Sequence, residues 1–220
     1  RKILHNVSFS VKRGTKVGIC GRTGAGKSTI LNLLFRLVDP CDGNILLDGG
    51  DISHTSLTKL RNSLTLIPQN PILFKGTVAF NLCPTHNHNS NPTLLWEALD
   101  AVNLSDFVKA NGGLDKFLIE AEGANLSQGQ RQLFSLARAI VRKRPILILD
   151  EPTSNVDKEA DQLIRGLMQT DVFGENVTTI TVAHRISSIK DSDLIVVMDK
   201  GVVAETGTPE ELQTKGSINF

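Results

Sequence analysis

Apolar and polar positions follow two recurring patterns along the chain, and these predict strands and helices in turn. Short apolar runs bounded by turn residues have the length of strands and lie at 17–20, 64–67, 146–149, 178–182 and 194–198. The run Ile146-Leu147-Ile148-Leu149 is apolar throughout, which is typical of a strand buried on both faces of a parallel sheet. Together with the helical stretches between the runs, this predicts a three-layer α/β fold with a mainly parallel sheet.

Antiparallel β structure is expected in addition to the parallel sheet. Alternation in Val7-Ser8-Phe9-Ser10-Val11 predicts a half-buried strand, and Gly43 to Gly50 is expected to form another strand that ends in a tight turn. Asp199-Lys200-Gly201 is predicted to join the run 194–198 to Val202-Val203-Ala204-Glu205 as a hairpin.

The segment from Gly76 to Asn125 has a different character, with helical periodicity separated by polar loops. A long amphipathic helix is predicted from Ser127 to about Arg142, and Ser127 is placed to cap it. The apolar face of this helix carries Leu133, Leu136, Ala137 and Ile140. We therefore expect a helical sub-domain over residues 76–142, inserted into the α/β core.

The segment Gly21-Arg22-Thr23-Gly24-Ala25-Gly26-Lys27-Ser28 has the spacing of a phosphate-binding loop between a strand and a helix, the helix running to about Leu37. Glycines let the backbone adopt positive φ angles and approach an anion, and the helix N-terminus adds unsatisfied donors. Lys27 can reach the β- and γ-phosphates, and the Ser28 hydroxyl can ligate Mg²⁺. We therefore predict that this segment and Thr29 bind ATP with Mg²⁺. The alternative is an ordinary glycine-rich turn.

Two carboxylates follow the buried run at 146–149. Asp150 ends a strand expected beside that of the phosphate loop, where it can hold Mg²⁺ directly or through water. Glu151 points elsewhere, and it is the candidate general base for a water that attacks ATP. Alone, such a pair is more commonly a solvated turn, but downstream of a phosphate loop it indicates nucleotide hydrolysis.

Composition narrows the classes of function. The 220 residues carry a net charge of +1, which gives no electrostatic reason to expect nucleic acid as a partner. The apolar runs are much shorter than a membrane span. Cys20, Cys41 and Cys83 are not spaced as a disulfide framework or a zinc site, so a reducing compartment is expected. Since residue 1 is not methionine, we expect a piece of a longer protein.

Leu126-Ser127-Gln128-Gly129-Gln130 and the helix after it resemble the signature motif of ATP-binding cassette proteins. The other motifs of that family stand in its order, namely the phosphate loop, Gln69 after a strand, Asp150-Glu151-Pro152-Thr153, Ser154-Asn155-Val156-Asp157, and His184-Arg185. The resemblance covers almost the whole chain and implies a P-loop ATPase core. Residues 67–78 and 123–127 are most similar to exporter cassettes, especially the C-terminal cassette of the C subfamily of multidrug-resistance-associated transporters.

The resemblance also implies roles for individual residues. In this family two cassettes pair head to tail, so that Ser127, Gly129 and Gln130 would contact the nucleotide bound by the other cassette. Gln69 would sense Mg²⁺ and the attacking water, and His184 would contact the γ-phosphate and orient Glu151 or the water. Local alternatives remain open, since Ser127 and Asp157 can be simple helix caps and a lone histidine after a strand is usually structural.

Residues 1–220 are thus expected to form one nucleotide-binding domain that drives export, at the cytoplasmic face of a membrane and attached to transmembrane domains. The aromatic residue on which the family stacks adenine is expected upstream of residue 1, because only Phe9 precedes the phosphate loop. Two alternatives are a non-hydrolysing ATP-dependent gating module and a soluble cassette ATPase that acts on ribosomes or DNA ends.

Overall fold

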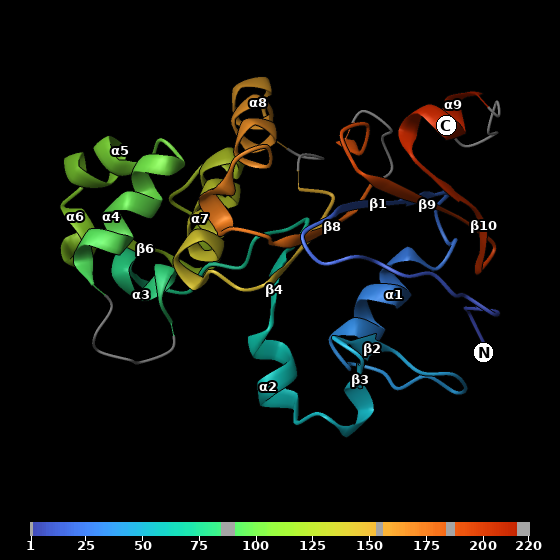
Figure 1. The fold of residues 1–220 in the computed structure, drawn as a ribbon. Coiled ribbons are helices and arrows are strands. Elements are labelled where there is room, and N and C mark those ends of the chain that lie inside the picture. Colours follow the sequence, from blue (N-terminus) through green and yellow to red (C-terminus); the bar gives the residue numbers. More distant parts are fainter. Residues whose placement is uncertain (1, 85–90, 153–155, 184–187, 215–220) are drawn as a thin grey trace. The chain divides into compact units, whose positions relative to one another are not determined.

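The computed structural model describes residues 2–84, 91–152, 156–183 and 188–214. Its contacts divide the chain into two compact units (Figure 1). The first unit holds residues 1–65, 144–151 and 176–220, and the second holds residues 66–143 and 152–175. The phosphate loop and the carboxylate pair belong to the first unit, whereas Gln69 and the signature motif belong to the second.

A six-stranded sheet organises the first unit, in the order β10-β9-β1-β8-β7-β4. Its strands are β1 (Lys16–Gly21), β4 (Leu64–Ile67), β7 (Ile146–Asp150), β8 (Thr178–Val182), β9 (Leu194–Asp199) and β10 (Val202–Gly207). β1 runs parallel to both β8 and β9, and β7 runs parallel to β8. β9 and β10 form the predicted antiparallel hairpin. The mainly parallel sheet with an antiparallel portion is confirmed.

The position of β7 corrects one prediction. Because β8 lies between β1 and β7, the strand that ends at Asp150 is not beside the strand of the phosphate loop. Periodicity along a sequence identifies strands but carries no information about their neighbours. All three strands are parallel, so their carboxyl ends still meet at one edge of the sheet.

Residues on the two faces of the sheet enter two separate apolar clusters. Val17 and Ile19 of β1 pack with Ile30 and Leu31 of α1 (Lys27–Leu34). Cys20 of the same strand packs in the other cluster. That cluster includes Ile195 and Val197 of β9 and Leu212 of α9 (Pro209–Thr214). Helices therefore cover both faces of the sheet, as the three-layer prediction requires.

Two local expectations were wrong. No strand forms at Val7–Val11, although Val7, Phe9 and Val11 do pack against the core, so the alternation reflects burial on one side without strand pairing. The helix after the phosphate loop ends at Leu34 rather than Leu37. The strand expected within Gly43–Gly50 is present but short, since β2 (Leu46–Leu47) ends in a tight turn and pairs with β3 (Gly50–Asp51). η1 (Ile52–His54) and α2 (Leu57–Asn62) complete the first unit.

Helices dominate the second unit, and α7 (Gln128–Arg142) is the longest of those described. The others are α3 (Val78–Leu82), α4 (Pro92–Ala101), α5 (Ser105–Ala110), α6 (Gly113–Lys116) and α8 (Lys158–Leu167), with the short turns η2 (Ala121–Gly123) and η3 (Asp171–Phe173) and the two-stranded ladder β5 (Gly76–Thr77) and β6 (Leu118–Ile119). The predicted apolar face of α7 is buried, and α3 and α4 pack against this helix.

The described helices include none that is long and apolar enough to cross a membrane. Cys20 and Cys41 are free thiols.

Candidate active site

The phosphate loop connects β1 to α1, and its two ends can be occupied only by glycine. Gly21 has φ 147°, and a Cβ there would lie 2.2 Å from the carbonyl oxygen of Met198 on β9. Gly26 has φ 102°, and a Cβ there would lie 2.5 Å from the Leu4 side chain. Gly24 also has a positive φ but has open space around it. The loop is therefore tightly held at both ends and open at its middle.

The turn between β9 and β10 fastens the loop to the N-terminal stretch of the chain. The amide of Gly201 donates to the carbonyl oxygen of Ala25 at 3.1 Å, and the carbonyl oxygen of Gly201 accepts from the amide of His5 at 2.7 Å. A Cβ at Gly201 would lie 2.0 Å from the carbonyl oxygen of Ile3. Glycine is thus required where the three segments meet.

The first turn of α1 is suited to hold an anion. Its N-cap is Gly26, which offers no side-chain acceptor, and its first turn contains no acidic residue. The first amides of a helix have no partner within it, and they carry a partial positive charge. The amide of Thr29 donates to the carbonyl oxygen of Gly26 at 3.1 Å, whereas the amides of Lys27 and Ser28 are placed to meet an external acceptor such as phosphate.

Lys27 is buried at the start of α1, with 5% of its surface exposed. Its ammonium donates to the carbonyl oxygens of Gly21 at 2.7 Å and Arg22 at 3.2 Å. Burial lowers the pKa of Lys27 below its usual value, and the nearby carboxylates Glu151 and Asp150 act in the opposite direction. An ammonium can donate more than two hydrogen bonds, so Lys27 can hold the loop and still meet a phosphate oxygen.

Asp150 and Glu151 lie at the carboxyl end of β7, within the electrostatic reach of Lys27. Asp150 stands in register with Val182 of β8, and the amide of Glu151 donates to the carbonyl oxygen of Val182 at 3.0 Å. Glu151 has φ 48°, a left-handed conformation that costs about 1–2 kcal/mol for a residue with a side chain. Strained backbone conformations of this kind persist only where the surrounding structure holds them, and they are concentrated at functional sites.

The side-chain oxygens of Ser28 and Asp150 are suited to bind Mg²⁺. Ser28 is exposed on the first turn of α1 and presents a hydroxyl, and Asp150 presents a carboxylate. Hydroxyl and carboxylate oxygens are the ligands that Mg²⁺ prefers, together with substrate phosphates. The structure therefore brings Lys27, Ser28, Asp150 and Glu151 to one unit, with Arg22 and Thr23 exposed on the loop and Thr29 half-buried beside Ser28.

The signature motif forms the N-terminus of α7 in the second unit. The Ser127 hydroxyl oxygen accepts from the amide of Gln130 at 3.1 Å, and the Gln130 side-chain oxygen accepts from the amide of Ser127 at 2.9 Å. This reciprocal pair is a capping box, so the prediction that Ser127 caps the helix is confirmed. The cap uses an acceptor of Ser127, so its hydroxyl hydrogen can still be donated, and the amide of Gly129 lies in the first turn.

Asp157 caps α8 in the same unit, where its Oδ1 accepts from the amide of Ala160 at 2.8 Å. A Cβ at Gly129 would lie 3.0 Å from Oδ2 of Asp157. The signature motif and the start of α8 are therefore in close contact, and Gly129 permits this approach.

Gln69 follows β4 and is half-buried in the second unit. Next to it, the carbonyl oxygen of Pro68 accepts a long hydrogen bond of 3.4 Å from Nε2 of Gln132. Gln132 was not predicted from the sequence. Its side-chain amide lies on the buried face of the predicted helix, and buried polar groups need hydrogen-bond partners, so its position was a signal that could have been used. His184 and residues 153–155 lie outside the described part of the chain.

Arg138 of α7 was also missed. Its Nε donates to the carbonyl oxygen of Asn81 at 2.8 Å and its Nη1 to that of Ile72 at 3.1 Å, and the guanidinium lies 5.8 Å from the centre of the Phe74 ring. Burial, and to a smaller extent Arg142, lowers the pKa of Arg138 to about 10. Ile72 and Phe74 are 64% and 44% exposed, so this arginine supports an apolar surface that follows Gln69.

Comparison with known proteins assigns the family. The family model described as "ABC transporter" matches residues 4–154. ATP-binding cassette sub-family C member 3 of Mus musculus is 46% identical over 219 residues, 99% of this chain and 14% of that protein. ABC transporter C family member 5 of Arabidopsis thaliana is 46% identical over 219 residues, with the same coverage of 99% and 14%. The chain therefore belongs to the ABC transporter family, as an ATP-binding cassette of the kind in which ATP hydrolysis resides.

Within the family the cassette is of the C-subfamily type, as the sequence predicted. ATP-binding cassette sub-family C member 2 of Homo sapiens is 44% identical over 220 residues, 99% of this chain and 14% of that protein. The chain thus spans a small part of the length of these relatives. A solved bacterial Atm1-family ABC exporter with ATP bound matches 100% of this chain and 38% of that chain, with 37% identity and a TM-score of 0.91. The predicted ATPase fold is confirmed.

Proposed function

We propose that this cassette binds MgATP in the first unit and hydrolyses it to drive export by a membrane transporter. The observation that carries the proposal is the grouping of Lys27, Asp150 and Glu151 at the carboxyl edge of one parallel sheet, beside the uncapped N-terminus of α1. Phosphoryl transfer to water needs phosphate donors, charge neutralisation and a proton acceptor, and these residues can supply each of them.

Each residue has a separate task in this proposal. The loop amides and Lys27 bind the phosphates, and Lys27 stabilises the charge that develops as the terminal phosphate leaves. Ser28 and Asp150 would hold Mg²⁺, which neutralises phosphate charge when it is bound. Glu151 accepts the proton of the attacking water, and its left-handed backbone sets the direction in which its side chain leaves the chain. His184 would orient this water from the γ-phosphate side.

The site is completed by a second cassette in a head-to-tail dimer. In that arrangement the Ser127 hydroxyl, the Gly129 amide and Gln130 meet the γ-phosphate bound by the other cassette. The amides and hydroxyl at the start of α7 are suited to an anion even though the capping box stabilises the helix. The exposed Ile72 and Phe74 would receive the transmembrane domains of the parent transporter at the cytoplasmic face.

A single-turnover assay tests the proposal on the full-length transporter. Substituting Glu151→Gln should leave ATP binding intact and slow hydrolysis by about a hundredfold or more, because general base catalysis contributes about 10²–10⁴-fold. Glu97→Gln on the exposed face of α4 is the matched control and should hydrolyse ATP at the rate of the unaltered protein. Equal rates for Glu151→Gln and its control would remove Glu151 as the base. A protein that binds ATP without hydrolysing it would instead be a gating module.

A further inference from the structure

The C-terminal end of α1 adopts a turn that normally ends in glycine, but Arg36 occupies the position. The amide of Leu37 donates to the carbonyl oxygen of Asn32 at 2.8 Å, and the amide of Arg36 donates to that of Leu33 at 3.0 Å. These two bonds define a Schellman motif, whose left-handed residue is usually glycine. Arg36 has φ 47°. Arginine is strained at this position, but its side chain can make contacts that glycine could not supply.

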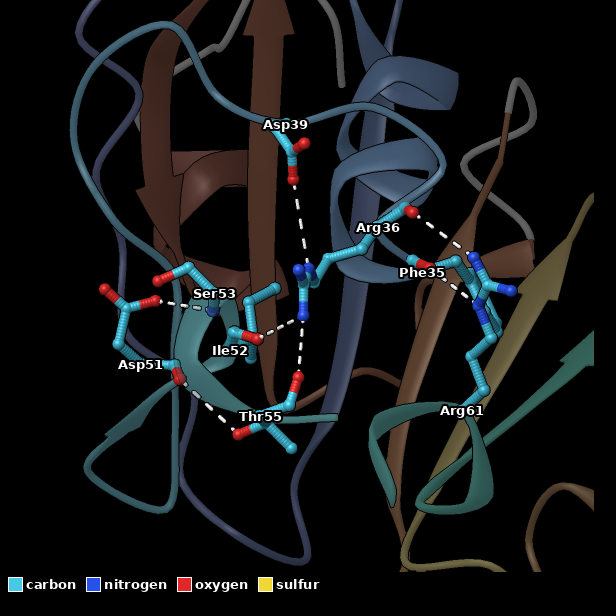
Figure 2. A network of polar contacts seen from close by, with 8 residues as sticks. All are labelled: Phe35, Arg36, Asp39, Asp51, Ile52, Ser53, Thr55 and Arg61. Carbon is cyan, nitrogen blue, oxygen red and sulfur yellow. Dashed lines mark hydrogen bonds and ion pairs between the residues drawn. The ribbon is translucent and has the colours of Figure 1, made fainter. Parts of the chain in front are cut away.

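The Arg36 side chain binds the segment that follows β3 (Figure 2). Its Nη1 donates to the carbonyl oxygens of Thr55 at 2.7 Å and Ile52 at 3.0 Å, and its Nε lies 3.8 Å from the Asp39 carboxylate. Only 20% of the arginine side chain is exposed. Hydrogen bonds from a charged and largely buried donor are stronger than neutral ones. Arg36 therefore ties the end of α1 firmly to residues 52–55.

The segment that receives Arg36 is itself well ordered. Oδ1 of Asp51 accepts from the amide of Ser53 at 2.8 Å, and this bond lowers the pKa of Asp51. The Ile52 side chain is buried in the same apolar cluster as Ile30 and Leu31 of α1. Apolar and polar contacts thus hold η1 to α1 at neighbouring points.

A second arginine acts on the same helix end. Arg61 of α2 donates from Nε to the carbonyl oxygen of Phe35 at 3.1 Å and from Nη2 to that of Arg36 at 3.2 Å. Figure 2 shows the Arg61 guanidinium reaching the end of α1, whereas the Arg36 guanidinium extends from that end to Ile52 and Thr55. Cations are favourable at the carbonyl end of a helix, so both stabilise α1 and fix its position.

We propose that Arg36 is a positioning residue for the phosphate loop. α1 carries Lys27 and Ser28 at its other end, about 12 Å away along an eight-residue helix. Because Arg36 prevents α1 from sliding or tilting relative to residues 52–55, it holds Lys27 and Ser28 at the place of the phosphates. This proposal rests on the ATP site described above.

Steady-state ATPase kinetics of the full-length protein test this with three variants. Arg36→Gly relieves the backbone strain but removes the guanidinium, and it should raise KM for ATP about tenfold while kcat changes less than about twofold. Arg36→Lys keeps a cation that can reach a carbonyl and should give an intermediate KM. Lys143→Gly is the matched control, because Lys143 is an exposed cation at the C-cap of α7 with φ 44°, and it should leave KM unchanged.

The outcomes separate positioning from simple stabilisation. If Arg36→Gly lowers the melting temperature but leaves KM unchanged, or if it raises KM no more than Lys143→Gly does, the proposal is wrong. If Arg36→Gly does not fold, Arg36→Lys decides, and an unaltered KM in that variant contradicts the proposal. Direct measurement of the Kd for ATP tests Arg36 even in a protein that does not hydrolyse ATP. Absence of hydrolysis in the unaltered protein would overturn the proposed function and not this inference.

Discussion

The N-termini of α1 and α7 are both assigned to nucleotide phosphates, yet they are built in opposite ways. α1 begins at a glycine with no side-chain cap, and its first turn contains no acid. α7 begins at Ser127, and Ser127 and Gln130 cap each other's amides. A serine cap stabilises a helix by about 1 kcal/mol relative to alanine, so the start of α7 has a stabilising contribution that needs no ligand and that α1 lacks.

The difference matches the tasks proposed for the two helices. The N-terminus of a helix binds phosphate more tightly when no side chain accepts hydrogen bonds from its first amides. A helix start that meets the nucleotide only when two cassettes close must keep its shape in the open state as well. The capping box does this while leaving the Ser127 hydroxyl hydrogen and the Gly129 amide for the phosphate.

Substitution can separate the capping role of Ser127 from its proposed role in binding phosphate. Aspartate caps helices as well as serine but cannot donate a hydrogen bond, and its charge repels phosphate. We expect Ser127→Asp to keep the melting temperature of the full-length protein and to lower its ATPase rate about a hundredfold. Ser56→Asp is the control, since Ser56 caps α2 in the same manner. Unimpaired turnover in Ser127→Asp would restrict Ser127 to its capping role.

The pH dependence of ATP binding tests whether the charge of Lys27 on α1 holds the phosphates. Burial lowers the pKa of Lys27, so Lys27 loses its charge at a lower pH than an ordinary lysine. ATP affinity should therefore be highest below this lowered pKa and fall by up to about tenfold per pH unit above it. Titration of the Kd between neutral and alkaline pH measures this. Lys27→Arg stays charged and should show a flat profile, and an equally steep fall in that variant would assign the effect to another group.

The packing of α7 against α8 should couple substitutions at Gly129 and Asp157 only weakly. Gly129→Ala improves helix propensity but places a Cβ 3.0 Å from Oδ2 of Asp157. Asp157→Ser keeps a capping oxygen and removes that contact. Gly129→Ala should therefore be more favourable by about 0.5–1 kcal/mol in the Asp157→Ser background than alone. Hydrogen exchange of the α7 and α8 amides measures the coupling in the full-length protein, and additive effects would show that the contact is too soft to matter.

The parts of the site that could be predicted from the sequence are local. Gly21 to Ser28, Asp150-Glu151 and the cap at Ser127 each combine a motif with a turn or helix end within a few residues, and the structure shows the expected local geometry. The parts that could not be predicted depend on distant partners. Arg138 binds carbonyl oxygens 57 and 66 residues away, and β8 enters the sheet between two earlier strands.

Alternation of apolar and polar residues can also predict a strand wrongly, because a segment can be buried on one side without pairing with another strand. Val7 to Val11 has the pattern of a strand because one side of it packs on the core, but its backbone joins no ladder. Arg36 was overlooked for a related reason, since a left-handed arginine has no signature in the sequence and its meaning depends on the carbonyl groups of residues 52 and 55.

The turn at Gly201 has a consequence for communication through the chain. Ala25 in the loop, Gly201 in the turn and His5 near the start of the chain form a relay of two backbone hydrogen bonds, in which no side chain takes part. A displacement of the loop would thus reach His5 through backbone atoms alone. Backbone contacts of this kind tolerate changes of side chain at Ala25 and His5, and they depend on glycine only at position 201.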